Sequence, residues 1–212
     1  MDYEIKQGRQ YQYRYQYIEE GEGDVLLLLH GLFGALSNFE GVISHFSKEY
    51  KVVVPLLPIY KLQLFDASLG GLVKHIIRFV KFKKFKKVKL VGNSLGGHLA
   101  LMYVLKKPEI VDALVLTGSS GLFEDTMGGS FPKRGSYEYI KERTEYTFYD
   151  PKSATKELID EVFEAVNDRH KVLRIIYMAR SAMRNNLSKE LPKIHCPSFL
   201  IWGENDNITP PF

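Results

Sequence analysis

Ser94 is the residue whose surroundings most clearly indicate chemistry. It lies at the centre of Gly92-Asn93-Ser94-Leu95-Gly96, after an apolar run over 88–91 and before an apolar helical pattern over 99–105. That order predicts a strand, a sharp turn and a helix, with the serine hydroxyl at the apex of the turn. Glycine at positions 92 and 96 lets the backbones on either side approach closely. A hydroxyl presented in this way suits nucleophilic attack on a carbonyl carbon.

Two other segments have the same form, an apolar run that ends in polar or glycine residues. The run over 25–29 leads into His30-Gly31, and the run over 199–202 leads to Gly203 and then Asp206. The backbone amide of Leu95, at the start of the helix after Ser94, is placed to stabilise a developing oxyanion.

The three segments together resemble the α/β-hydrolase superfamily. The resemblance implies that Leu32, two residues after the histidine, gives the second oxyanion amide and that Asp206 is the acid of a catalytic triad. It also implies that His30 anchors the oxyanion turn and does not act as the base. Glu124 or Asp125, after the preceding strand, is an alternative acid.

A triad histidine is missing from the expected place. In the family it follows the acid by a few dozen residues, whereas only six residues follow Asp206 and none of them is histidine. Thr209-Pro210 also has the pattern of a helix start. We therefore expect a sequence that is cut short, without the last strand and helix of the family. His98, one helical turn beyond Ser94, is interpreted as a packed or partly exposed helix residue.

Strand and helix patterns alternate up to Gly118, which predicts an α/β fold with a mostly parallel sheet and helices on both faces. The alternation then stops, and 119–191 shows helical patterns without a convincing strand. We expect three parts: a hydrolase core over 1–118, a helical cap over 119–191, and an incomplete continuation of the core over 192–212. The four tyrosines at alternate positions over 11–17 predict one half-exposed strand.

Composition excludes several classes of protein. The net charge of +4 is mild and does not argue for a nucleic-acid partner, so we expect none, and no apolar run approaches the length of a membrane span. No metal-binding motif and no cofactor motif is present, so we expect neither group. The single cysteine, Cys196, and the absence of a visible signal peptide favour the cytoplasm. The lysine-rich run over 81–89 is interpreted as a solvated helix end and loop.

The most specific expectation is a carboxylesterase-like enzyme that acts on small or medium apolar esters by acyl transfer. The alternative is a carbon–carbon bond hydrolase of the meta-cleavage-product type, whose elbow and cap segments resemble Gly92–Gly97 and 148–153. Those enzymes hold a substrate carboxylate with a cap arginine, and Val162 occupies that position here. An alternative of another class is a non-catalytic ligand-binding protein of the same fold. The sequence leaves the oligomeric state open.

Overall fold

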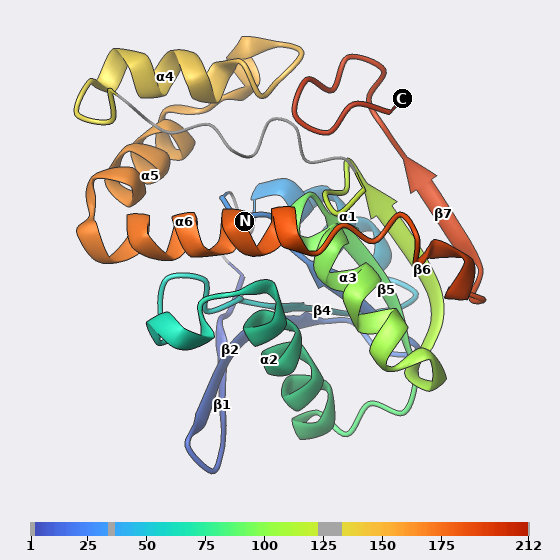
Figure 1. Cartoon of the computed structure of the whole chain (residues 1–212). Helices are drawn as coiled ribbons and strands as arrows, with labels where there is room; N and C mark the ends of the chain where they lie inside the picture. The colour runs from blue at the N-terminus through green and yellow to red at the C-terminus, as the bar shows by residue number, and fades with distance from the viewer. Residues whose placement is uncertain (1–2, 34–36, 123–132, 212) are drawn as a thin grey trace.

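The protein is built around one seven-stranded sheet (Figure 1). The computed structural model describes residues 3–33, 37–122 and 133–211. Along the sheet the strand order is β1-β2-β4-β3-β5-β6-β7. The strands in chain order are β1 (Lys6–Gln10), β2 (Tyr13–Glu20), β3 (Val25–Leu29), β4 (Lys51–Pro55), β5 (Val88–Asn93), β6 (Val111–Thr117) and β7 (Ser198–Ile201).

Five strands, from β4 to β7 along the sheet, are parallel, and β1 and β2 pair antiparallel at one edge. The central strands are apolar on both faces because helices cover both, as in Val25–Leu29, where four of the five residues are buried. The expected α/β fold with a mostly parallel sheet is confirmed. Because the parallel strands run the same way, their carboxyl ends and the loops that follow them lie in one row. We call this row of strand ends the carboxyl edge of the sheet.

Three helices belong to the sheet layers. Helices α2 (Leu69–Phe82) and α3 (Leu95–Lys106) pack on one face, where Leu27 and Leu90 belong to their hydrophobic cluster. Helix α1 (Glu40–Phe46) covers the other face through Ile43, against a cluster that includes Leu26 and Leu28. The alternation of Leu26, Leu27 and Leu28 between these clusters is the two-residue period of a strand buried on both faces.

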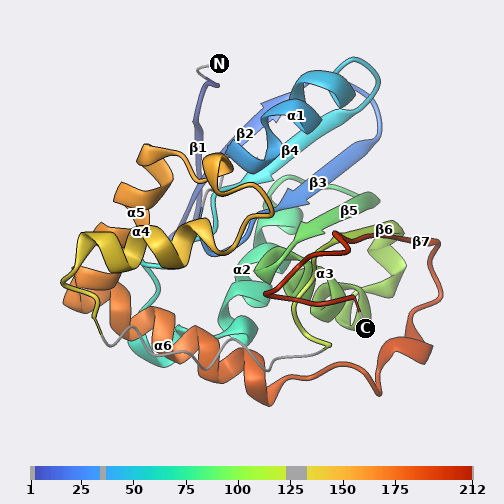
Figure 2. The same ribbon diagram turned by 90° about the horizontal axis from the view of Figure 1, so that it is seen from above.

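Beyond β6 the described chain forms three more helices before it returns to the sheet at β7. These are α4 (Tyr137–Glu145), α5 (Lys156–Asn167) and α6 (Arg169–Arg184), and Figures 1 and 2 show them beside and above the carboxyl ends of the strands. Helix α6 is joined to the core, since Met178 and Ala182 belong to the same cluster as α2 and the Ser181 hydroxyl accepts a hydrogen bond from Leu69 N at 3.1 Å. Helices α4 and α5 share a smaller cluster around Ile140, Val162 and Val166, which also contacts Phe33.

The tyrosine-rich segment differs from the expected single strand. Tyr11 lies in the turn between β1 and β2, with φ of 55°, and is 82% exposed. Tyr15 and Tyr17 are buried and do not face solvent, because α2 packs over this side of the sheet through Phe79. The alternating pattern therefore marks a strand whose tyrosine face is part of the core.

Candidate active site

Ser94 occupies a sharp turn between β5 and α3. Its φ and ψ are 52° and −118°, a conformation that non-glycine residues rarely adopt. A backbone held in such a region stores strain of about 1–3 kcal/mol, which persists only where the surroundings fix it. The observed geometry places the serine at a strand-to-helix apex, at the carboxyl edge of the sheet.

Hydrogen bonds from three directions fix the turn. Ser94 N donates to Thr117 O at 3.1 Å, which joins the turn to the end of β6. Ser94 O accepts from Gly97 N at 3.0 Å, from His98 N at 3.2 Å and from Ser120 N at 3.2 Å. The side chain of Asn93 donates to both oxygens of Thr117. The strained residue is thus held by its own helix and by the neighbouring strand.

Gly92 and Gly96 lie where the backbones on either side come together. A β-carbon on Gly92 would lie 2.5 Å from Gly96 O, and one on Gly96 would overlap the backbone carbonyl of Leu29. Both obstacles are main-chain atoms, which cannot move aside as a flexible side chain would. Only glycine at these two positions allows β3, β5 and α3 to meet at the serine.

The His30-Gly31-Leu32 segment lies against the serine. A β-carbon on Gly31 would be 3.6 Å from the β-carbon of Ser94, so the two turns are neighbours across β3 and β5. The segment is held from its other side by the Tyr60 hydroxyl, which donates to Leu32 O at 3.3 Å. Leu95 is buried at the first turn of α3, and the side chain of the N-cap residue, Ser94, makes no capping hydrogen bond. The Ser94 hydroxyl is therefore not used to cap its own helix.

His30 is held by its own loop. Its Nδ1–H donates to Gly31 O at 2.7 Å, and its Nε2 accepts from Leu57 N at 3.0 Å. Burial lowers the pKa of the ring, although the bond to Gly31 opposes that shift. Both ring nitrogens of a neutral imidazole are used, so His30 fixes the turn and has no nitrogen left for Ser94.

Asp206 lies beyond the end of β7, one strand removed from the serine strand. Its Oδ1 accepts from Ile208 N and Thr209 N, both at 2.8 Å, and its Oδ2 accepts from the Thr209 hydroxyl at 3.0 Å. A β-carbon on Gly118, at the end of β6, would be 3.0 Å from that Oδ2. Because β6 separates β5 from β7, the serine and carboxylate backbones are on the order of 10 Å apart, a gap that one side chain could bridge.

His98 is fully buried, and both of its ring nitrogens lie near polar groups other than the serine hydroxyl. Its Nε2 contacts Asn185 O at 2.8 Å, just beyond α6, and its Nδ1 is 3.4 Å from the Ser120 hydroxyl. Burial lowers its pKa, against the opposing effect of the Asn185 bond. Within the described ranges no hydrogen bond joins an imidazole to the Ser94 hydroxyl. The described histidines therefore make their contacts elsewhere than at the Ser94 hydroxyl.

Ser120 and Tyr60 are not predicted as site residues from the sequence, and the structure places both beside the serine turn and the His30-Gly31-Leu32 segment. Ser120 binds Ser94 O through its amide and links the serine turn to His98, whereas Tyr60 supports Leu32. The available signal was the run Ser119-Ser120-Gly121 immediately after an apolar strand that neighbours the serine strand. Ligands of open α/β sheets bind beyond the carboxyl ends of the strands, where this run lies.

Neither Val162 nor Arg174 forms a carboxylate clamp in the described part of the helical segment. Val162 is buried within the α4–α5 cluster. The Arg174 guanidinium is bound to Leu62 O and His170 O, and Arg169, Arg180 and Arg184 are exposed. The alternative acids Glu124 and Asp125 lie outside the described residues.

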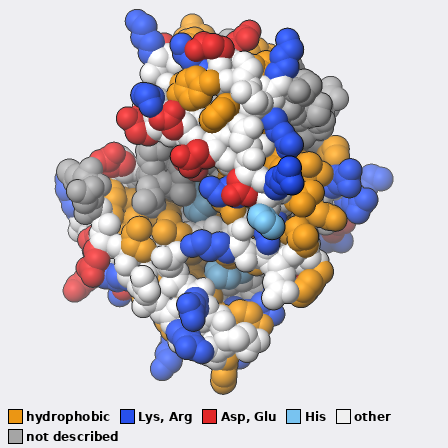
Figure 3. All heavy atoms as spheres, turned by 90° about the vertical axis from the view of Figure 1, so that its left-hand side faces the viewer, with side chains coloured by type: hydrophobic (Ala, Val, Ile, Leu, Met, Phe, Trp, Pro, Cys, Tyr) orange, Lys and Arg blue, Asp and Glu red, His pale blue; other side chains and the backbone are white. Residues whose placement is uncertain are grey.

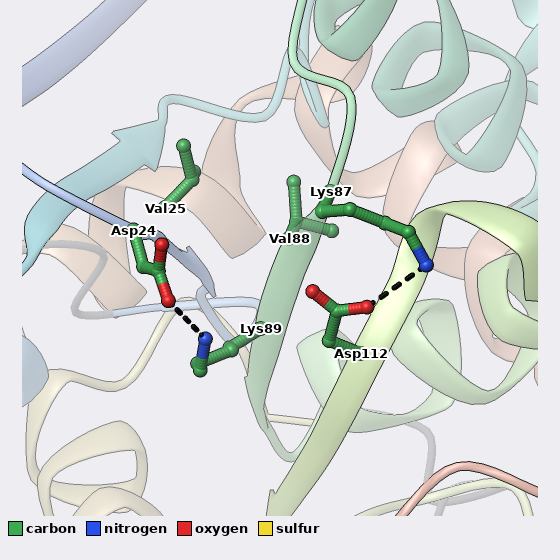
Figure 4. A pocket seen from close by; sticks show the side chains of 6 residues that line it. All are labelled: Asp24, Val25, Lys87, Val88, Lys89 and Asp112. Carbon is green, nitrogen blue, oxygen red and sulfur yellow. Dashed lines mark hydrogen bonds and ion pairs between the residues drawn. The ribbon is translucent and has the colours of Figure 1, made fainter.

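A small recess at the opposite edge of the sheet is unrelated to the serine (Figure 4). Two ion pairs close it, Lys87–Asp112 at 2.9 Å and Lys89–Asp24 at 2.7 Å, at the amino ends of β3, β5 and β6. Over the described ranges, no cluster of His, Cys, Asp or Glu is placed to hold a metal ion. Nor is any helix in those ranges long and apolar enough to cross a membrane.

The sheet, the strained serine and the adjoining His-Gly turn define a class of protein, and the comparison of sequences agrees with it. Residues 24–212 match the model of the alpha/beta hydrolase fold family, so the chain belongs to that family. The inferred resemblance is confirmed.

Known relatives give the family context. The chain is similar to an alpha/beta hydrolase enzyme, MGS-MChE2, from the metagenome of sediments of the lagoon of Mar Chica, Morocco; identity is 42%, the TM-score is 0.76, and 97% of this chain and 78% of that chain are covered. It is 26% identical to a 2-hydroxy-6-oxo-6-phenylhexa-2,4-dienoate hydrolase of Comamonas testosteroni, over 92% of this chain and 75% of the relative. The meta-cleavage product hydrolase CumD of Pseudomonas fluorescens IP01 superposes with a TM-score of 0.79 at 26% identity, covering 93% of this chain and 79% of that one.

Proposed function

We propose that the protein is a serine hydrolase that acts by acyl transfer on small or medium apolar carboxylic esters. The observation that carries the proposal is the conformation of Ser94, with φ of 52° at a strand-to-helix turn and the Gly31 turn alongside. A strained serine between two backbone turns suits attack on a carbonyl carbon with amides ready to receive the oxyanion. Cys196 is a free thiol, and a reducing compartment such as the cytoplasm is part of the proposal.

The proposed reaction has two steps. In the first, the Ser94 oxygen bonds to the ester carbonyl carbon, the carbonyl oxygen becomes an oxyanion held by the amides of Leu32 and Leu95, and the alcohol leaves with a proton. In the second, water adds to the acyl-serine carbon and releases the carboxylic acid and free Ser94. An imidazole is needed to carry the proton in both steps, and Asp206 is the carboxylate that would orient it.

Helices α4, α5 and α6 are proposed to act as a cap over this site, so that their apolar cluster and Phe33 limit the substrate to apolar acyl or alkyl groups. The arrangement of arginines favours an ester over the carbon–carbon substrates of the named relatives. The Comamonas testosteroni relative is by its name a hydrolase of a dienoate, and a carboxylate on such a substrate calls for a cationic partner. Val162 offers none, and Arg174 is bound to backbone carbonyls. Carbon–carbon cleavage is the second candidate because two of the similar proteins have that type of name.

The test separates the nucleophile from the base. Purified protein is incubated with p-nitrophenyl butyrate, with and without free imidazole as an external base, and the acyl adduct is located by mass spectrometry. We expect an adduct on Ser94 and a release of p-nitrophenol that exceeds the rate with imidazole alone, whereas Ser94→Ala should give no adduct and only the protein-free rate. Ser44→Ala, on the exposed side of α1, is the matched control and should behave as the parent does.

An adduct on another residue, or equal rates for the parent and Ser94→Ala, would show that the turn is not the reactive site. The non-catalytic ligand-binding alternative would be favoured by a parent that forms no adduct but binds the carboxylic acid product with the same affinity as Ser94→Ala does. Faster turnover of a vinylogous 1,5-diketone acid than of the ester would favour carbon–carbon cleavage.

A further inference from the structure

Helix α6 is apolar on two faces, although only one of them is covered. Val172, Ile175, Met178 and Ala182 are buried against the rest of the protein. On the opposite side Leu173, Ile176 and Tyr177 are 44%, 41% and 45% exposed. A surface helix ordinarily carries polar residues on its outer face, so three large apolar residues there call for a partner.

Arginines lie at both ends of this outer face. Exposed Arg169 precedes the apolar group, and exposed Arg180 and Arg184 follow it. The spacing 169, 173, 176/177, 180 and 184 places all six residues on one stripe of the helix, about 22 Å long at 1.5 Å per residue. We call this set of six residues the outer α6 stripe.

The stripe is open and carries no negative charge. No Asp or Glu occurs between Arg169 and Lys189 in the sequence. Figures 1 and 2, at right angles to one another, both show α6 on the outside of the described molecule. Figure 3 shows hydrophobic side chains among Lys and Arg at mid-height along the right-hand edge, the height of α6 in Figure 1.

Charge decides which occupant fits. A second copy of the protein that met this face with its own would bring arginines against arginines with no carboxylate on either helix, which is unfavourable. An anionic lipid surface matches both parts of the stripe. Arginines would sit among the phosphates, the Tyr177 ring at the headgroup level, and Leu173 and Ile176 among the first carbons of the acyl chains.

We propose that the outer α6 stripe docks the protein reversibly on an anionic phospholipid surface, with α6 lying in the plane of the interface. The helix does not enter the core of the membrane, because its opposite face is packed on α2 through Met178 and Ala182. This inference stands on the exposure and charge of α6 and does not depend on the proposed ester hydrolysis.

Vesicle binding tests the proposal directly. The purified protein is sedimented with sucrose-loaded vesicles of phosphatidylglycerol and phosphatidylcholine in equal parts, and with vesicles of phosphatidylcholine alone. We expect binding to the mixed vesicles that is much weaker on phosphatidylcholine and that weakens between 0.1 M and 1 M salt, where the Debye length falls from about 10 Å to about 3 Å.

Two double variants separate charge from apolar contact. Each basic residue near an anionic surface contributes about 1 kcal/mol, about fivefold in partition coefficient, so Arg180→Gln with Arg184→Gln should lower binding about 25-fold. Leu173→Gln with Ile176→Gln should lower it at least about tenfold, since it removes the inserted side chains. Lys48→Gln with Lys106→Gln, an equal loss of exposed charge at the ends of α1 and α3, is the matched control and should bind as the parent does. Circular dichroism confirms that each variant is folded.

Several results would overturn the proposal. Equal binding to both kinds of vesicle would remove the charge argument, and an equal loss in the Lys48/Lys106 control would show a general effect of net charge. A parent that binds neither vesicle, but whose solution mass doubles with concentration until Leu173 and Ile176 are replaced, would make a second copy the occupant.

Discussion

Gly96→Ala tests whether the approach of α3 to β3 positions the serine turn. The new β-carbon would lie 2.8 Å from His30 O and closer still to Leu29 O, both in backbone that other contacts hold. Overpacking costs about 1–3 kcal/mol, and the upper part of that range applies here because no flexible side chain can move aside. Alanine in place of glycine within a helix returns about 1 kcal/mol. The expected net loss in the free energy of unfolding is about 2 kcal/mol.

The assay is thermal and urea unfolding followed by circular dichroism. For a chain of this size about 2 kcal/mol corresponds to a Tm lower by about 4–8 °C. The matched control is Gly41→Ala on α1, where a β-carbon would meet nothing within 4 Å, so stability should stay the same or rise by up to about 1 kcal/mol. A Gly96→Ala protein as stable as the parent, with an unchanged rate of Ser94 acylation, would refute the argument that backbone contact fixes this turn.

Two further predictions concern α2. Burial, with a smaller contribution from Arg78, lowers the pKa of His75 to about 4 from 6.5, so the unfolded chain takes up the proton first and stability is lost as the pH falls from 6.5 to 4. The loss amounts to about 3 kcal/mol at 1.36 kcal/mol per pKa unit, and His75→Gln should flatten the pH dependence of urea unfolding; an unchanged slope would contradict this origin. Ser68→Ala removes the hydrogen bond that Gly71 N donates to the Ser68 hydroxyl at 3.1 Å and should lower stability by about 1 kcal/mol in the same assay, whereas Ser44→Ala should not; equal effects would exclude a capping role.

The parallel core could be predicted from the sequence because each strand of that core is an apolar run with its own turn signal. The antiparallel edge could not. Lys6–Gln10 is a strand of polar residues and one glycine, without alternation, and pairing with β2 is what makes it extended. The Tyr11 turn could not be predicted either, because a tyrosine with positive φ has no local sequence signal.

The candidate site also has a part that the sequence predicts, the positions of its residues, and a part that it does not, their contacts. The placing of Ser94, Gly31 and Asp206 along one edge follows from strand order, which local motifs predict. The contacts of His98 depend on Asn185, far along the chain, and no pattern within α3 indicates that partner. The lysine-rich run is similar: Lys83 pairs with Glu19, and Lys87 and Lys89 pair with aspartates on β6 and before β3. Such pairs are set by the topology of the sheet and not by neighbouring residues.

The return of the chain to the sheet at β7 bears on the order in which the protein folds. In the part of the chain that the structure describes, strand β7 pairs with β6 alone. It comes back after a segment of about 80 residues, and closing so long a loop costs about 2 kcal/mol more than closing one of about ten. Phe199, Leu200 and Ile201 are 63%, 60% and 49% exposed, so little burial compensates. We therefore expect β7 to dock last during folding and to open first from the native state. Its amides should exchange hydrogen faster than those of β3 and β5, and the turn that holds Asp206 assembles only when that final pairing is made.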